Sequence, residues 1–192
     1  MNPPRTIAGI AVVISLAWNI NSCNSTSPES EGTEAKIEMV TEPFEARFLG
    51  TYTYAGPDTL PMPKCTDTLS TWRAIVDCQG TVNIFGDMTV HFDFCGNEKG
   101  YYGNTSAYML DSENDTLFIT CTGQVIQGKT EEHPAYVVSY WKDDFEILGG
   151  TGKFAGATGN GKTDDYNSSE DSSSHHHWTG SITYQKQIPR PD

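Results

Sequence analysis

The chain has 192 residues, 12 Lys and Arg against 25 Asp and Glu, and a formal net charge of −13 at pH 7. Such an acidic chain repels phosphates, which argues against binding of nucleic acid or an anionic membrane surface through a basic face. Cleavage before Cys23 would remove Arg5 and no acid, so the balance would become 11 − 25 = −14. We interpret the acidity as that of a solvated, soluble surface.

Residues 1–22 have the organisation of a signal peptide. Arg5 precedes the apolar run IAGIAVVISLAW at 7–18, which has the length of an h-region and is too short to span a bilayer. The next residues, INSC at 20–23, resemble the lipobox of bacterial lipoproteins, with Asn21 where that pattern has a small residue. The resemblance implies an exported protein of the bacterial cell envelope, anchored to a membrane by lipid on Cys23. The alternative is cleavage near Ser22, which would give a secreted soluble protein.

Five cysteines are an odd number for an exported chain, and setting Cys23 aside leaves Cys65, Cys78, Cys95 and Cys121. In an oxidising compartment we expect these four to form two disulfides, and all three connectivities remain open. The alternative is that they are small buried apolar side chains that never oxidise. No CxxC or CxxH spacing supports a zinc or redox motif.

The chain divides into four regions. Residues 23–43 are rich in Ser, Glu and Thr, which predicts a flexible tether, and 188–192 form a short tail. Residues 44–187 are enough for one domain. Within it, apolar and polar residues alternate over short runs, and no segment keeps a helical period, so we predict an all-β fold, an antiparallel barrel or sandwich of about eight strands. The runs are 46–56, 72–80, 88–96, 104–112, 115–126, 136–148, 159–167 and 176–186.

GATGNGKT at 156–163 matches the phosphate-binding pattern G-x-x-x-x-G-K-[ST]. A working P-loop needs a buried strand before it and a helix after it, because loop amides and the helix N-terminus hold the phosphates together. The polar, acidic stretch DDYNSSEDSSS follows instead, and it cannot bury one face of a helix. We therefore expect no nucleotide, and no motif calls for a cofactor.

The glycines in FEILGGTGKFAGATGNGKT, 145–163, have another interpretation. This segment strongly resembles the Gly-rich corner of the allene oxide cyclase barrel superfamily, which includes dirigent proteins and many bacterial exported proteins; FLGTYTY (48–54) and WTGSITY (178–184) are similar to its first and last strands. The resemblance implies an eight-stranded antiparallel barrel of allene oxide cyclase or calycin-like type. In it, Phe154 would plug the barrel end, and positive φ angles or close backbone approach would explain Gly149, Gly150, Gly152, Gly156 and Gly159.

Such a barrel is either filled by side chains or holds one small ligand. Plant cyclases act on a fatty-acid epoxide and dirigent proteins steer coupling of phenolic radicals, so the resemblance suggests a small apolar or aromatic ligand. The cyclases' carboxylate and asparagine pattern is absent from the first strand, which runs TYTYAGPD, so neither activity is carried over.

Three groups of residues are candidates for a site. His175 and His177 would share one face of a strand, and with Asp165 they could bind a divalent metal ion; a polar strand start is the alternative. His91 is a candidate catalytic base, because histidine titrates near neutrality. Tyr101 and Tyr102, beside glycines, are candidates for the rim of a ligand site, against an ordinary loop folded onto the barrel end.

Three functions are therefore open. The first is non-catalytic binding of a small apolar or aromatic molecule inside the barrel. The second is an enzyme, cyclase-like, isomerase-like or metal-assisted, acting on such a ligand. The third is an envelope adaptor whose loops bind a protein or glycan, and it predicts a filled barrel without an internal cavity.

Overall fold

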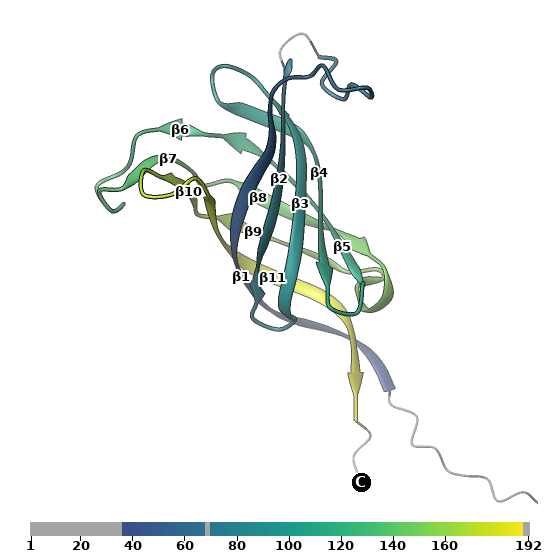
Figure 1. The fold of residues 1–192 in the computed structure, drawn as a ribbon. Helices are drawn as coiled ribbons and strands as arrows, with labels where there is room; N and C mark the ends of the chain where they lie inside the picture. Colours follow the sequence, from purple (N-terminus) through teal and green to yellow (C-terminus); the bar gives the residue numbers. More distant parts are fainter. Residues whose placement is uncertain (1–35, 68–69, 190–192) are drawn as a thin grey trace, which may run out of the picture. The chain divides into compact units, whose positions relative to one another are not determined.

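The structure is a computed structural model that describes residues 36–67 and 70–189. Its strands form one antiparallel sheet (Figure 1). Alternate side chains on most of the strands are buried. The elements are β1 (Lys36–Pro57), β2 (Trp72–Val82), β3 (Gly86–Gly96), β4 (Tyr101–Asp111), β5 (Thr116–Gln124), β6 (Ile126–Gln127), β7 (Val137–Trp141), β8 (Asp144–Gly150), the 3₁₀ turn η1 (Gly152–Phe154), β9 (Thr158–Thr163), β10 (Asp165–Ser168) and β11 (Ser174–Ile188).

Eight of the strands close into a ring. The order is β1-β2-β3-β4-β5-β8-β9-β11, and β11 pairs with β1 from Lys36↔Ile188 to Gly50↔Ser174. The predicted all-β, eight-stranded antiparallel barrel is therefore confirmed. The three short strands belong to the same runs, since β6 continues β5, β7 leads into β8 and β10 continues β9. They pair with one another and with the start of β11, and they lie together away from β2, β3 and β4 (Figure 1).

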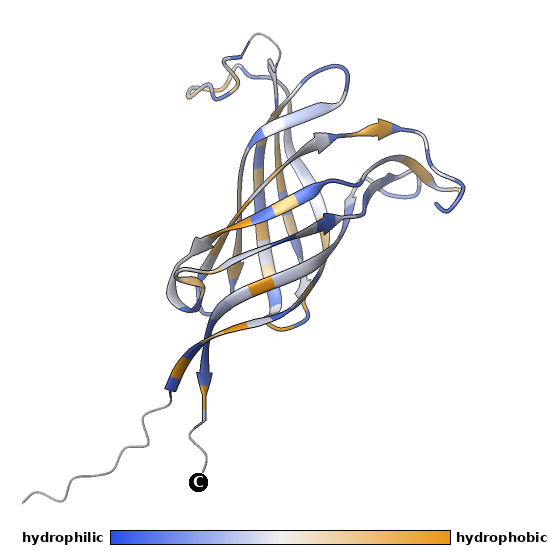
Figure 2. Ribbon diagram, turned by 180° about the vertical axis from the view of Figure 1, so that it is seen from behind, coloured by the Kyte–Doolittle hydropathy of each residue, from blue (hydrophilic) through white to orange (hydrophobic). Residues whose placement is uncertain are grey.

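The alternation of the sequence explains the interior. Figure 2 shows orange and blue segments alternating along the strands, as expected when successive side chains point to opposite faces. The inward side chains of seven of the eight ring strands, all except β9, form one hydrophobic cluster. Each large apolar side chain that is fully buried there stabilises the fold by about 1.5–3 kcal/mol. Members from five strands are Phe48, Phe92, Met109, Leu117, Ile119 and Trp178.

The glycine corner closes one end of the barrel. Phe154 is completely buried and its ring meets Phe85 edge-on at 4.8 Å, while Phe85 meets Tyr184 in the same way at 4.9 Å. Gly152 has φ +52°, and a Cβ there would lie 1.7 Å from Asp115 Oδ1, so only glycine fits. Among the other corner glycines, positive φ occurs at Gly149 and Gly156, and backbone carbonyls leave no room for a Cβ at Gly150 and Gly159.

The folded domain begins earlier than residue 44. β1 starts at Lys36, so 36–43, which the composition assigned to the tether, pair with β11 instead. The polar residues of this segment suggested a tether, but they have partners on β11. Lys186 Nζ lies 2.6 Å from Glu42 Oε1, and the hydroxyl of Tyr184 donates to Glu42 Oε2 at 2.7 Å. Strand pairing here depends on the backbone and on these polar contacts rather than on a buried apolar face.

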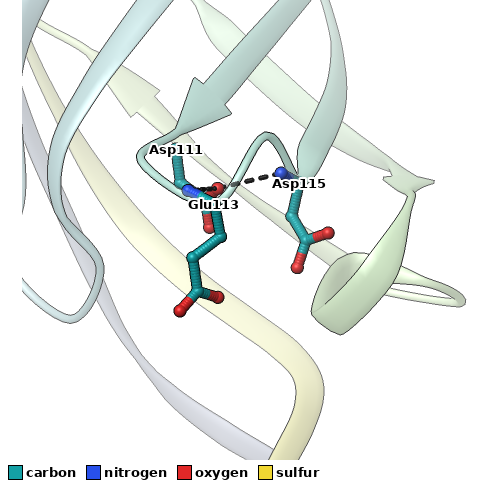
Figure 3. A group of neighbouring side chains, drawn as sticks. All are labelled: Asp111, Glu113 and Asp115. Atoms are coloured by element: carbon teal, nitrogen blue, oxygen red, sulfur yellow. Dashed lines mark hydrogen bonds between the residues drawn. The ribbon is translucent and has the colours of Figure 1, made fainter.

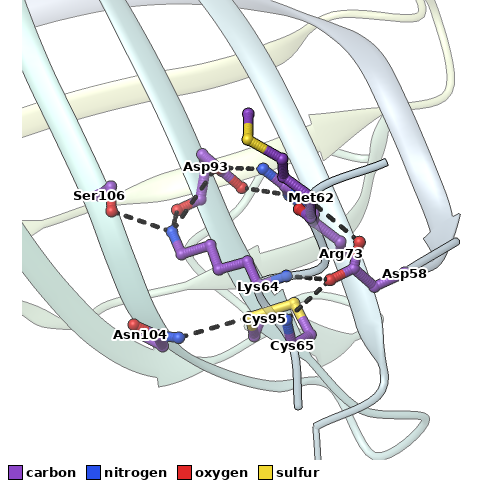
Figure 4. Close-up of a disulfide and its surroundings, with 9 residues drawn as sticks. All are labelled: Asp58, Met62, Lys64, Cys65, Arg73, Asp93, Cys95, Asn104 and Ser106. Atoms are coloured by element: carbon purple, nitrogen blue, oxygen red, sulfur yellow. Dashed lines mark hydrogen bonds and ion pairs between the residues drawn. A yellow bond between two sulfur atoms is a disulfide. The ribbon is translucent and has the colours of Figure 1, made fainter. Parts of the chain in front are cut away.

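A strap, residues 58–67, is fixed to strands β2, β3 and β4 (Figure 4). Arg73 donates two hydrogen bonds to Asp93, of 2.8 and 2.7 Å, and Asp58 Oδ1 lies 3.4 Å from the same guanidinium. The ammonium of Lys64 donates to the Asp93 carbonyl and, over 3.0 Å, to Ser106 Oγ. The side chains of Arg73 and Asp58 are almost fully buried, so the strap shields these charges from water.

The four cysteines within the described residues form one disulfide rather than two. Cys65 of the strap is bonded to Cys95 of β3. Cys78 and Cys121 are buried free thiols on inward positions of β2 and β5. These two cysteines match the alternative expectation of small buried apolar side chains, since both belong to the hydrophobic core.

The P-loop-like segment is part of the barrel wall. Residues 158–163 form β9, which continues into β10 rather than into a helix. Within residues 36–67 and 70–189, no helix is long and apolar enough to cross a membrane. The signal peptide, Cys23, tether residues 24–35 and the last tail residues, 190–192, lie outside the described residues.

Candidate ligand-binding pocket

A pocket lies at the barrel end opposite Phe154, next to the short strands β7 and β10. Its volume is about 40 Å³ and its walls are mostly apolar. Aromatic rings from five strands line it, because each occupies an inward position near the end of its strand. They are Tyr52, Phe92, Phe94, Tyr102, Trp141 and Trp178.

The floor of the pocket is a buried carboxylate. Asp165, at the start of β10, is 1% exposed and accepts hydrogen bonds from the backbone N–H of His177 and the indole N–H of Trp178, both at 3.1 Å. The indole nitrogen of Trp178 is also 3.1 Å from the second carboxylate oxygen. These hydrogen bonds connect the bend between β9 and β10 to β11. They also give the buried carboxylate oxygens hydrogen-bond donors.

His176 is the cation that matches this carboxylate. Its Nδ1 lies 3.2 Å from Asp165 Oδ2, its Nε2 lies 2.8 Å from Ser174 Oγ, and its ring stacks on Phe92 at 5.6 Å. Burial lowers the pKa of His176, but the charge of Asp165 and contacts with Asp165 and Cys78 outweigh burial and raise it to about 10. At neutral pH the ring is therefore an imidazolium, and neither nitrogen offers a lone pair to a ligand.

Ser174, His176 and Asp165 have the connectivity of a hydrolase triad, but they do not form one. Ser174 is 1% exposed and does not line the pocket, so no substrate carbonyl reaches its hydroxyl. A Cβ on Gly50 would lie 2.4 Å from Ser174 Oγ, which shows how tightly this group is enclosed. The three side chains are a buried polar connection between strands.

A second carboxylate supports the wall of the pocket. The phenol of Tyr102 donates to Asp143 Oδ2 at 2.7 Å, and the backbone N–H of Asp143 donates to Thr163 Oγ1 at 3.0 Å. Burial raises the pKa of Asp143, partly offset by the bond from Tyr102, and burial also raises that of Tyr102 well above its usual range. A Cβ on Gly123 would lie 1.9 Å from Asp143 Cγ, so this glycine makes room for the carboxylate.

Cys121 also lines the pocket. Burial, and next the charge of Asp165, raise the pKa of its thiol to about 12. Because the thiolate is the nucleophilic form, Cys121 is an inert apolar wall at neutral pH.

The tyrosine pair at 101 and 102 is divided between the two sides of the sheet. Tyr102 lines the pocket, whereas Tyr101 is 53% exposed and takes no part in it. His91 lies on the outer face of β3, where its Nδ1 is 2.7 Å from Asp77 Oδ1 and its ring stacks on Tyr108. The structure therefore gives His91 no route to the pocket.

The proposed metal ligands are not brought together. His175 and His177 do share the outer face of β11, where they contact Asp171 at 3.0 Å and Glu45 at 3.1 Å respectively. Asp165 points to the interior and pairs with His176, a residue that was not among the predicted ligands. His175 and His177 therefore lie on the opposite side of the sheet from Asp165, and the structure does not bring these three side chains together.

A different acidic group lies at the turn between β4 and β5 (Figure 3). Oxygens of Asp111, Glu113 and Asp115 are within 4.8 Å of one another. Asp111 Oδ1 accepts the backbone N–H groups of Glu113 and Asp115 at 2.9 Å each, while Lys153 Nζ is 2.6 Å from Asp111 Oδ2. This arrangement stabilises a tight turn and links it to the glycine corner through Lys153.

Sequence reasoning missed most of the pocket. The alternation of His176 and Trp178 with their neighbours was a usable signal for one inward face, and Asp165 opposite them was visible only once the register was known. Tyr52 and Trp141 carried no signal beyond aromatic character. Their place follows from the ends of β1 and β7 meeting at the open end.

The comparisons with known proteins assign no family to this chain. No protein-family model matches the chain, and no curated protein matches it. The solved structure of the pterocarpan synthase dirigent protein GePTS1 is similar to the chain at a TM-score of 0.42 and 17% sequence identity, over 87% of this chain and 100% of that one. A likeness at this level does not transfer a function.

Proposed function

We propose that the protein binds a small apolar or aromatic molecule at the open end of the barrel without transforming it. The observation that carries the proposal is a pocket of aromatic rings whose ionisable groups are matched to one another. Asp165 is paired with His176, and Tyr102 with Asp143. Concave, largely apolar sites with a few placed polar groups are the usual form of small-molecule sites.

The size of the pocket limits the ligand. A volume of about 40 Å³ corresponds to about three water molecules at roughly 10–15 Å³ each. Such a space takes one edge of a single ring, with the rest of the molecule in the mouth beside Tyr52, which is 39% exposed. We therefore expect ligands of one ring rather than long fatty chains.

The enzyme alternative has less support. A general base needs a free lone pair within reach of the substrate, and both nitrogens of His176 face protein partners. The thiol of Cys121 is protonated, and His91 is on the outer surface. The adaptor alternative predicts a barrel without a cavity, which does not fit the pocket described above.

A cavity-filling substitution tests the proposal. Ethylbenzene and acetophenone are the probes, and binding to the purified full chain is followed by ligand-observed NMR. Val125→Phe places a ring in the pocket and is expected to abolish binding of both probes, whereas Val138→Phe on the outer face of β7 leaves it unchanged. Binding that survives Val125→Phe, or that is absent from the unmodified protein, would contradict the proposal.

We also propose that the protein is exported and held at the bacterial envelope by lipid on Cys23. The lipobox resemblance supports this, and a disulfide between Cys65 and Cys95 agrees with an oxidising compartment. Metabolic labelling with a tagged fatty acid should mark the wild-type chain and not Cys23→Ser, and the variant should leave the membrane fraction. Equal labelling of both chains would contradict lipid attachment at this residue.

A further inference from the structure

We infer that Trp141 selects the ligand: its indole N–H donates a hydrogen bond to a neutral oxygen acceptor attached to an aromatic ring. The preferred ligand is then an oxygenated aromatic such as an aryl ketone, and an aromatic hydrocarbon of equal size binds less well. This inference rests on the proposed binding function and adds the chemical class of the ligand.

The two indoles of the pocket differ in one respect. The N–H of Trp178 is satisfied by both oxygens of Asp165. The N–H of Trp141 donates to no acceptor among residues 36–67 and 70–189, although the residue is only 7% exposed. Trp141 Nε1 is not among the polar atoms that are both fully enclosed and without a hydrogen-bond partner. Some of the surface of this nitrogen is therefore accessible.

The position of Trp141 is well defined. It is the last residue of β7, where Val137, Ser139 and Trp141 alternate inward, and it is the cross-strand partner of Asp165. Its ring packs edge-on against His176 at 5.7 Å. Because strand pairing and this contact hold the indole, its N–H is preorganised for an acceptor that enters the pocket.

The other polar groups of the lining already have partners, and the contact of His176 Nδ1 with Asp165 Oδ2 is an ion pair without a hydrogen bond. The Tyr102 hydroxyl donates to Asp143, and the nitrogens of His176 face Asp165 and Ser174. Tyr52 interacts with Asn167 through its side chain. A hydrocarbon that covered Trp141 would bury its N–H group without an acceptor, which costs free energy of binding. A carbonyl oxygen would accept a hydrogen bond from this group and avoid that cost.

The charge of the pocket favours a neutral acceptor. No Lys or Arg side chain lines it within the described chain, and the imidazolium of His176 is already matched by Asp165. A carboxylate ligand would lose its hydration and gain no free cation in return. An aryl carboxylate is therefore expected to bind more weakly than the corresponding ketone.

Acetophenone and ethylbenzene test the inference, because they share a carbon skeleton and differ by a carbonyl in place of a methylene. Dissociation constants are measured for the full chain and for Trp141→Phe, which keeps an aromatic ring and removes the donor. We expect Trp141→Phe to weaken acetophenone by about 3- to 10-fold, the range of one neutral hydrogen bond, and to change ethylbenzene by less than about 2-fold. Trp72→Phe, outside the pocket, is the matched control and should change neither.

A second measurement uses the unmodified protein and does not depend on the variant folding. With ¹⁵N-labelled tryptophan, acetophenone should shift one indole N–H signal downfield, and ethylbenzene should not. Equal weakening of both probes by Trp141→Phe, no downfield shift, or tighter binding of benzoate than of acetophenone would each overturn the inference and leave the pocket standing. Failure of both probes to bind the unmodified protein would overturn the binding function itself.

Discussion

The indole nitrogen of Trp178 lies 3.1 Å from each carboxylate oxygen of Asp165, inside the barrel. Both side chains are about 1% exposed, so the charge has no water to solvate it. The remaining partners are the His176 imidazolium and the backbone N–H of His177. These contacts therefore stabilise the buried charge of Asp165. In turn, the carboxylate links β10 to β11.

We expect Asp165→Asn to lower the free energy of unfolding by about 3–5 kcal/mol, because it leaves the buried cation of His176 without its partner. Urea unfolding followed by circular dichroism measures the change. Asp164→Asn is the matched control: that carboxylate is half-exposed and pairs with Lys142 at 3.3 Å, so its loss should cost less than about 1 kcal/mol. Similar losses in the two variants would contradict a buried ion pair at Asp165.

Stability should fall as pH rises above neutrality. The pKa of His176 is raised to about 10 in the folded protein, above its unfolded value near 6.5. The pairing therefore stabilises the fold fully below about pH 6.5 and loses its contribution as pH rises towards 10, with a slope approaching about 1.4 kcal/mol per pH unit. The thiol of Cys121, with a folded pKa of about 12, adds to the decline only above about pH 8.5.

The slope between pH 6.5 and 8 is thus diagnostic of His176. Unfolding free energies measured at several pH values should show the decline in the wild type and in His175→Gln, whose ring lies on the outer face. His176→Gln should be less stable but nearly independent of pH over this interval. A wild-type protein without the decline would rule out a raised pKa at His176.

Gly123→Ala should disturb the wall of the pocket. The new methyl group would lie 1.9 Å from Asp143 Cγ, so the carboxylate must move away and release the Tyr102 hydroxyl. We expect a loss of about 1–3 kcal/mol, typical of overpacking. At Gly103, by contrast, the nearest atom to an added Cβ is Thr122 Cγ2 at 3.5 Å, and Gly103→Ala should change stability little. Equal thermal midpoints for the two variants would argue against the close contact.

The disulfide should contribute appreciably to stability. Cys65 and Cys95 are 30 positions apart, and replacing both by Ala is expected to cost about 3–4 kcal/mol through the greater freedom of the unfolded chain. Thiol labelling of Cys23→Ser without reductant measures the pairing directly: labelling at Cys78 and Cys121 alone, and only in denaturant, is expected. Absence of any label under those conditions would reveal a second disulfide.

Much of the fold could be predicted from the sequence because alternation determines strands. Each of the eight runs contains one strand of the closed ring. The bends at Val125, Lys142–Asp143 and Asp164 were not predicted, because no glycine or proline marks them. The early start of β1 was missed for a similar reason: Glu42 and its polar neighbours resemble a tether until their partners on β11 are known.

Less of the site could be predicted. Alternation correctly separated His176 from His175 and His177, but it could not tell which face is interior. Asp165 is inward only because β10 pairs with the start of β11 in the register that places Tyr166 opposite His175. A shift of one residue would have exposed Asp165 instead, so the ion pair depends on long-range register rather than on local pattern.

The pairing of β1 with β11 also sets the order in which the protein acquires its structure. The hydroxyls of Thr41 and Thr183, 142 positions apart, are 2.7 Å from each other in this ladder. Closing so large a loop is slow, and it must wait until the last strand has been synthesised. A chain cut short before Ser174 would leave β1 and β9 as open edges, ready to pair with other chains. The final strand is thus what separates a closed barrel from an aggregating fragment.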